Sequence, residues 1–112
     1  MKKIKWKLPH ITDTLLGRIF LKKRHQVGIC CIIKDENQYL EEWMRYHLQI
    51  GVTHFFIYDN ESTVSVRDTL ARLDLLTYAT VIDFPGKSQQ VPAYAHCLEH
   101  FGFWCRWLAF ID

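Results

Sequence analysis

The alternation of apolar and polar stretches predicts three strand–helix units and a final strand. Three continuous apolar, β-prone runs are typical of strands buried on both faces: 27–33, 54–58 and 79–84. Each is followed by a segment whose apolar residues recur at helical spacing: within 34–51, 66–73 and 92–101. A last apolar run occupies 106–112. Strands separated by about 20 residues of helical pattern indicate an α/β fold with a mostly parallel sheet and helical crossovers.

The final strand is the irregular part of this pattern. A parallel strand at Trp107 to Ile111 should be covered by a following helix, and the sequence ends without one. We therefore expect an exposed apolar edge at this strand, a feature that favours aggregation.

Charge divides the chain into two segments. Residues 1–24 hold eight Lys or Arg and one acid, giving +7, whereas residues 25–112 hold six basic and eleven acidic residues, giving −5. The first segment also has apolar residues on one side of a possible helix: Ile11, Leu15, Leu16, Ile19 and Phe20. Such a segment can lie on an anionic membrane surface or pack on the domain itself. The acidic segment argues against nucleic acid as a partner, because it repels phosphates.

The cysteines and the apolar runs point to a cytoplasmic protein, with membrane contact at most peripheral. Cys30 and Cys31 are adjacent in a strand, so they should face opposite sides of the sheet, and no C-x-x-C spacing occurs. Reduced, buried cysteines are the expectation. No apolar run approaches the roughly 20 residues that span a bilayer.

Polar residues gather where the predicted strands end, which is where open parallel sheets bind ligands. They are Lys34, Asp35, Glu36, Asn37, Asp59, Asn60, Asp83 and Asp112. The chain has neither the G-x-G-x-x-G nor the P-loop pattern. Carboxylates can accept hydrogen bonds from ribose hydroxyls or a base N–H, and a divalent cation would then bridge a diphosphate. The alternative for Asp59 and Asn60 is a simple turn, with Ser62 or Thr63 capping the next helix.

Two long stretches carry a family resemblance. KDENQYLEEWMRYHLQIGVTHFFIYDNES, residues 34–62, resembles the opening of glycosyltransferase family 92 and related family 2 enzymes. VPAYAHCLEHFGFWCRWLAFID, residues 91–112, is similar to a later helix and strand of the same family. The resemblance implies a Rossmann-like GT-A fold that binds a nucleotide-sugar, with 1–24 as a separate basic segment and 25–112 as the amino-terminal part of that domain.

The resemblance also implies roles for individual residues. Lys34 and Glu36 match the loop lining the nucleotide pocket, Asp59 with Asn60 matches the strand end that contacts the base or ribose, and Asp112 matches the first metal-binding aspartate of an Asp-x-Asp motif. A Mn²⁺ or Mg²⁺ cofactor follows. Asp35 departs from the family's asparagine and adds a negative charge near the expected phosphates.

The implied reaction is transfer of a sugar to a hydroxyl of a glycan or lipid-linked acceptor, in surface glycan or lipopolysaccharide synthesis. The second aspartate of the metal motif and the acceptor half would follow Asp112, so the 112-residue chain alone is expected to be inactive. The alternative is a non-catalytic remnant that binds only nucleotides or a membrane surface.

Two other site patterns compete with this interpretation. HCLEH, residues 96–100, matches the H-x-x-E-H zinc pattern, but the sequence after it is too short to supply a third ligand. Asp35 and Glu36 resemble the acidic cluster of a phosphoacceptor domain, but no lysine on a late strand completes that site. Both rank below the transferase interpretation.

Overall fold

The computed structural model of the protein describes residues 4–6 and 24–111. These residues form a five-stranded sheet in the order β1-β5-β2-β3-β4. The strands are β1 (Ile4–Trp6), β2 (His25–Ile33), β3 (His54–Asp59), β4 (Ala79–Asp83) and β5 (Cys105–Ile111). The helices between them are α2 (Asn37–Gln49), α3 (Val66–Arg72) and α4 (Gln90–Phe101). The strands from β2 to β5 pair in parallel, which confirms the predicted α/β class.

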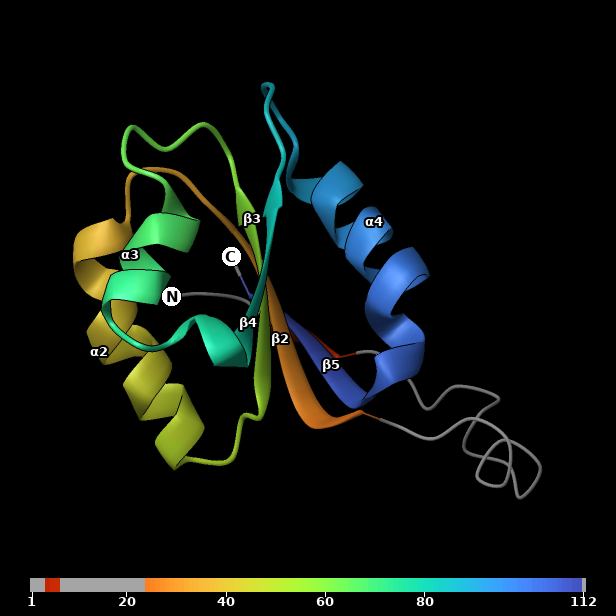
Figure 1. Cartoon of the computed structure of the whole chain (residues 1–112). Coiled ribbons are helices and arrows are strands. Elements are labelled where there is room, and N and C mark those ends of the chain that lie inside the picture. Colours follow the sequence, from red (N-terminus) through yellow and green to blue (C-terminus); the bar gives the residue numbers. More distant parts are fainter. Residues whose placement is uncertain (1–3, 7–23, 112) are drawn as a thin grey trace, which may run out of the picture.

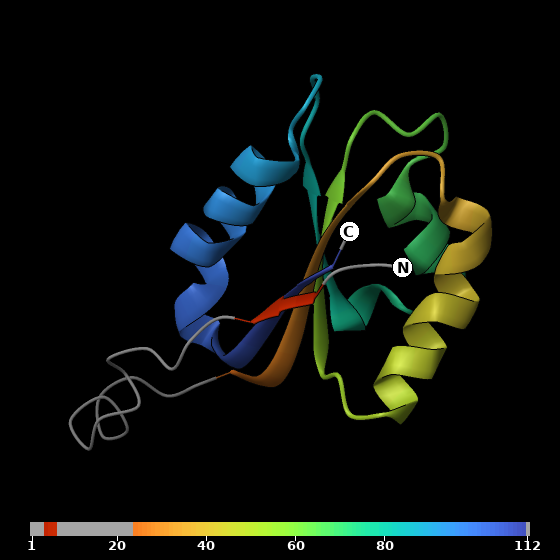
Figure 2. The same cartoon turned by 180° about the vertical axis from the view of Figure 1, so that it is seen from behind.

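The helices cover the two faces of the sheet unequally. Helices α2 and α3 lie on one face and α4 lies on the other, as Figure 1 and the reverse view in Figure 2 show. The chain steps from β2 through β3 to β4 in one direction, and α4 then returns it to β5 on the opposite side of β2. The strand order therefore reverses between β2 and β5, which makes that position the topological switch point of the sheet.

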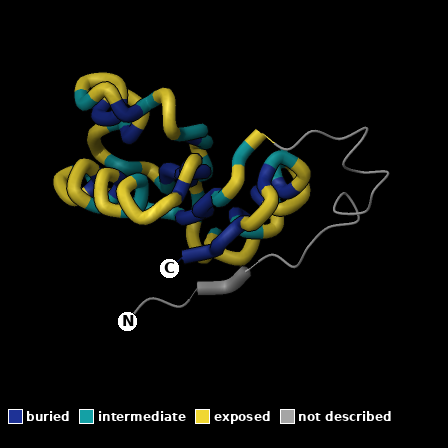
Figure 3. The backbone as a smooth tube through the Cα atoms, turned by 90° about the horizontal axis from the view of Figure 1, so that it is seen from below, coloured by how far each residue is buried: buried dark blue, intermediate teal, exposed yellow. Residues whose placement is uncertain are grey.

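Two apolar cores lie on either side of the sheet because side chains alternate along each strand. Phe55 and Ile57 pack under α2 and α3, whereas Phe56 and Tyr58 pack under α4. Cys31 belongs to the first core and Cys30 to the second, as predicted from their adjacency. All four cysteines are buried thiols. Figure 3 shows the buried residues concentrated between the helices and the sheet.

The sequence predicts an exposed edge at the last strand. This prediction is wrong for the carboxyl-terminal half of β5. Strand β1 pairs antiparallel with β5, with Ile4 opposite Ile111 and Trp6 opposite Ala109. This strand lies within the basic segment 1–24, which the sequence assigns to a separate role. A three-residue strand flanked by lysines has too little apolar pattern to be recognised from sequence.

The rest of the basic segment is not described. Residues 7–23, which include the apolar positions of the proposed amphipathic helix, lie outside the described residues, as does Asp112. Among the residues that the structure describes, no helix has the length and apolar character needed to cross a membrane.

Gly28 lies where three strands meet, and its lack of a side chain is a packing requirement. It is opposite His54 of β3 and Leu108 of β5. A Cβ atom at this position would lie 2.8 Å from the Sγ atom of Cys105 and 3.1 Å from the ring of Phe56. Both neighbours belong to the core under α4, so neither can move into solvent.

We expect Gly28→Ala to lower the free energy of unfolding by about 1–3 kcal/mol, as overpacked cores do. Chemical denaturation of the two proteins measures the difference. Gly51→Ala is a useful comparison, because a Cβ there meets no atom within 4 Å and the positive φ of 113° supplies the only strain. Equal stability of Gly28→Ala and the parent would contradict the packing account.

The start of the sheet holds two stacked histidines. The rings of His25 and His54 have centroids 4.1 Å apart and planes 11° apart, and the Nε2 atom of His54 is 2.8 Å from the hydroxyl of Thr80. Burial, with a smaller contribution from the nearby His25, lowers the pKa of His54 to about 4. The pKa of His25 is lowered as well, by burial and by Arg24. Both rings are therefore neutral in the folded protein at neutral pH.

Stability should consequently fall as the pH is lowered from 7 toward 4. The unfolded chain protonates these histidines near pH 6.5 and the folded chain does so only at lower pH, so unfolding takes up protons in this range. Allowing for partial solvent access, we expect a loss of about 2 kcal/mol, measured by denaturation at several pH values. In His54→Gln the slope between pH 6.5 and 4.5 should be shallower; an unchanged slope would assign the pH dependence to other groups.

Candidate functional site

The carboxyl ends of the central strands lie at one level of the sheet. Ile33 of β2 is opposite Asp59 of β3, which is opposite Asp83 of β4. The predicted alignment of polar strand ends is therefore present for these three strands. Ligands of open α/β sheets bind beyond such ends at the switch point, which here lies between β2 and β5.

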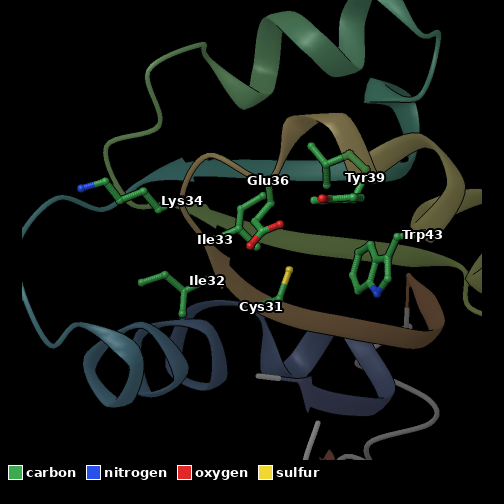
Figure 4. A pocket seen from close by; sticks show the side chains of 8 residues that line it. Cys31, Ile32, Ile33, Lys34, Glu36, Tyr39 and Trp43 are labelled. Atoms are coloured by element: carbon green, nitrogen blue, oxygen red, sulfur yellow. The ribbon is translucent and has the colours of Figure 1, made fainter. Parts of the chain in front are cut away.

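A pocket of about 420 Å³ opens beside the end of β2. It is lined by Cys31, Ile32, Ile33, Lys34, Glu36, Tyr39, Leu40 and Trp43. Figure 4 shows Tyr39 and Trp43 on the α2 side, with Cys31 on the β2 strand facing them and Glu36 between. The pocket thus combines an apolar wall, two aromatic rings and one charge of each sign. Its volume falls within the roughly 300–1,000 Å³ of small-molecule sites.

The loop between β2 and α2 delivers the charged residues to this pocket. Lys34 and Glu36 are exposed, and no side chain caps the amino end of α2, where Glu36 is the residue before the first helical turn. Helix amino ends carry unpaired amide hydrogens and a partial positive charge. The loop therefore offers an ammonium group and a helix terminus to an anion, and a carboxylate to hydroxyl or N–H donors.

Asp35, which the sequence placed near the phosphates, is held by the β3–α3 loop. Its carboxylate accepts a hydrogen bond from the amide of Thr63 at 2.7 Å, and its own amide donates to the hydroxyl of Ser62 at 3.0 Å. The Thr63 amide is the main cause that lowers the pKa of Asp35. Asp35 has a positive φ of 55°, consistent with a tight turn between Lys34 and Glu36.

Asp59 is almost fully buried, with 7% of its surface exposed. One carboxylate oxygen accepts the amide of Ser62 at 3.0 Å and the other accepts the amide of Val66, the first residue of α3, at 3.1 Å. The turn interpretation is thus confirmed for this side chain, although the helix cap predicted at Ser62 or Thr63 is wrong: the side chain of Ser65 caps α3. Direct contact of Asp59 with a nucleoside stays a prediction.

Asn60 connects β3 to the loop after β4. Its Nδ2 atom donates to the carbonyl oxygens of Phe84 and Gly86, both at 2.8 Å. The carboxylate of Glu61 accepts the amide of Gly86 at 2.9 Å. The side-chain amide of Asn60 therefore has a structural role in holding this loop. Asn60 does not line the pocket.

The predicted metal site is not formed by the residues that the structure describes. Asp112, its expected ligand, lies outside them, and no group of three or more His, Cys, Asp or Glu side chains within 4–6 and 24–111 is placed to hold a metal ion. The H-x-x-E-H pattern likewise has no third ligand there. The structure thus brings together Lys34 and Glu36 of the predicted site, whereas the side chains of Asp59 and Asn60 are hydrogen-bonded to the adjoining loops.

The aromatic side of the pocket does not follow from the pattern of polar strand ends. The helical spacing of apolar residues within 34–51 accounts for Trp43 as a core position, and it gives Tyr39 no role. Their spacing of four residues places them on one helical face, and Tyr39 is 58% exposed. An aromatic pair one turn apart, directly after the charged loop, is the signal from which this wall could have been predicted.

Comparison with known proteins identifies relatives across most of the chain. Residues 25–112 match the family described as Glycosyltransferase family 92. A family 92 protein of Oryza sativa subsp. japonica is 34% identical over 92 residues, which cover 81% of this chain and 16% of the rice protein. One of Ricinus communis is also 34% identical over 92 residues, covering 81% and 17%, and one of Arabidopsis thaliana is 28% identical over 90 residues, covering 80% and 16%. No solved structure matches significantly.

Replacing Asn60 with Ala should loosen the loop after β4 without changing the residues that line the pocket. Two carbonyl oxygens lose their donor, so we expect the free energy of unfolding to fall by about 1–3 kcal/mol. Hydrogen exchange should become faster at the Gly86 amide and its neighbours. Gln38→Ala, an exposed amide on α2, is the matched control. Unchanged exchange in Asn60→Ala would show that these hydrogen bonds do not hold the loop.

Proposed function

The chain belongs to glycosyltransferase family 92, and from this premise we propose that residues 25–112 form the donor-binding part of a nucleotide-sugar-dependent glycosyltransferase. The chain spans 16–17% of the length of the rice and castor-bean relatives given above, so the activity of the whole protein is itself part of the proposal. The observation that carries the proposal is the pocket between the end of β2 and α2, which contains Lys34 and Glu36.

The pocket suits the base and ribose of a nucleotide. Tyr39 and Trp43 offer rings on which a base can stack, an interaction worth roughly 1–3 kcal/mol per base. The exposed carboxylate of Glu36 can accept a hydrogen bond from a ribose hydroxyl or a base N–H. We place the nucleoside against this wall, with the diphosphate toward the loop.

The loop suits the diphosphate. Lys34 supplies a positive charge, and the uncapped amino end of α2 supplies amide hydrogens and the positive end of the helix dipole. The negative charge of Asp35, the residue after Lys34, is directed to the amide of Thr63. The departure of Asp35 from the family's asparagine therefore costs less phosphate affinity than its position in the sequence suggests.

Asp59 supports this arrangement through its neighbours. Its carboxylate accepts a hydrogen bond from the amide of Ser62. The hydroxyl of Ser62 in turn accepts one from the amide of Asp35, the residue after Lys34. We propose that Asp59 positions the loop, in addition to any contact between its remaining lone pairs and the ribose. We further propose that Asp112 binds Mn²⁺ or Mg²⁺, which would neutralise the leaving diphosphate.

The reaction proposed for the complete protein is transfer of a hexose or similar sugar to a hydroxyl of a surface glycan, lipopolysaccharide or lipid-linked acceptor. Catalysis of this kind depends on groups that stabilise the charge developing on the diphosphate. Within the described residues, Lys34 and the amino end of α2 are suited to that role.

Titration of the chain with uridine diphosphate, with and without Mn²⁺, tests the proposal. Lys34→Ala and Glu36→Gln should each weaken binding by about tenfold, or about 1.4 kcal/mol. Both side chains are exposed, so folding should be unaffected. Lys87→Ala and Glu42→Gln remove the same charges at exposed positions outside the pocket and should leave affinity unchanged.

Equal affinity of all four variants would reject the pocket as the donor site. Asp59→Asn is informative only beside a denaturation curve, since its carboxylate also holds the loop. Binding by the chain, together with no sugar transfer by the full-length protein, would support the alternative of a non-catalytic nucleotide-binding module.

A further inference from the structure

The end of the sheet opposite the pocket carries exposed apolar side chains. The connections before β3, β4 and β5 all lie at this amino end, because the strands from β2 to β5 run in parallel. Figure 2 shows α4 ending beside the start of β5. Each of the three connections exposes one large apolar residue, Ile50, Tyr78 or Phe103, and Trp107 near the start of β5 is 37% exposed. Exposed apolar groups of this size can mark an interaction surface.

Two arginines accompany the aromatic residues at the start of β5. Phe103 and Trp104 belong to the short 3-10 turn Gly102–Trp104, and the exposed side chains of Arg106 and Trp107 follow in β5. The Cζ atom of Arg24 lies 4.2 Å from the centroid of the Trp104 ring, and the Arg24 amide donates to the Trp104 carbonyl oxygen at 3.0 Å. These five residues form an aromatic–basic corner of the domain.

Acidic residues are concentrated at the other end of the sheet. The carboxyl ends of the strands and the loops after them hold more acids than lysines: Asp35, Glu36, Asp59, Glu61 and Asp83 against Lys34 and Lys87. The connections at the amino end and the last helical turns before them contain the acids Asp74 and Glu99 and the base Arg72. With Arg24 and Arg106, the amino end has the more positive charge. An anionic surface is therefore attracted to this end and repelled by the end that carries the pocket.

The basic segment of the chain joins the domain at this same end. Strand β1 runs antiparallel to β5, with Trp6 opposite Ala109, so the chain after Trp6 heads toward the amino end of β5. Residues 7–23 connect Trp6 to Arg24 and contain four Lys or Arg and one acid. Positive charge in the sequence thus continues directly from the aromatic–basic corner.

We propose that the aromatic–basic corner is a docking surface for an anionic lipid bilayer. Phe103 and Trp107 enter the headgroup region, and Arg24 and Arg106 contact lipid phosphates. Peripheral membrane surfaces combine apolar groups that insert with basic groups that are attracted to anionic lipids, and tryptophan is enriched at the membrane–water interface. The acidic end of the sheet, with the pocket, then faces away from the bilayer. This interaction does not depend on the proposed donor site.

Co-sedimentation of the whole chain with vesicles of phosphatidylcholine and phosphatidylserine tests this surface. Binding is expected, and it should weaken as salt is added and be lost with phosphatidylcholine alone. Phe103→Ser should weaken binding about tenfold through lost apolar burial. Arg106→Gln should weaken it about fivefold through lost attraction.

Matched controls lie at the acidic end of the sheet. Val91→Ser and Lys87→Gln change exposed residues in the first turn of α4 and the loop before it, and both should bind vesicles as the parent does. Denaturation curves of all variants separate lost binding from lost folding. Arg106→Gln removes only an exposed charge, so it keeps the test valid even if Phe103→Ser lowers stability.

A second readout reports insertion itself. Lipids with brominated acyl chains should quench the tryptophan fluorescence of the parent more than that of Trp107→Phe. Every variant keeps residues 1–24, so equal vesicle binding by the parent, Phe103→Ser and Arg106→Gln would assign membrane contact to that segment and overturn the proposal. Absence of vesicle binding, together with a dimer that Phe103→Ser dissociates, would instead identify a second copy of the chain as the partner.

Discussion

Parallel pairing of β2 with β3 on one side and with β5 on the other is the constraint on which the structure depends. Both pairings require Gly28, where any side chain would meet Cys105 and Phe56. They also set the direction of the chain, because α2 and α3 extend the sheet one way and α4 returns it the other way. This reversal places the switch point beside β2, and the pocket that contains Lys34 and Glu36 lies between the end of the same strand and α2.

The loops at the carboxyl ends of β2, β3 and β4 are connected by hydrogen bonds. Asp59 fixes the β3–α3 loop, and this loop holds Asp35 and therefore the charged residues on either side of it. Asn60 extends the same network to the loop after β4. Polar residues that the sequence alone suggests as ligands are thus also the supports of the site. A substitution in this network would alter the stability of the fold as well as the shape of the loops, which is why exposed pocket residues are the cleaner probes of the proposed function.

The two faces of the sheet have different chemistry. The face under α2 and α3 carries the pocket, whereas the face under α4 carries Tyr58, His96 and His100. Tyr58 and Asp59 are consecutive residues of β3 and point to opposite faces, so one strand contacts His96 of α4 on one face and the first turn of α3 on the other. The end of β3 is therefore hydrogen-bonded to elements on both faces of the sheet, although neither side chain lies on the surface.

The sequence by itself determined the α/β class and the parallel strands to within about two residues, because buried strands and amphipathic helices have distinct periodicities. It also identified Lys34 and Glu36, which follow directly from a strand end. Only the tertiary structure decided that Ile4–Trp6 completes the sheet and that Tyr39 and Trp43 form a wall of the pocket. The hydrogen bonds from two backbone amides to the carboxylate of Asp59 are likewise visible only in the tertiary structure. These features depend on contacts between residues distant in sequence, which local patterns of polarity do not encode.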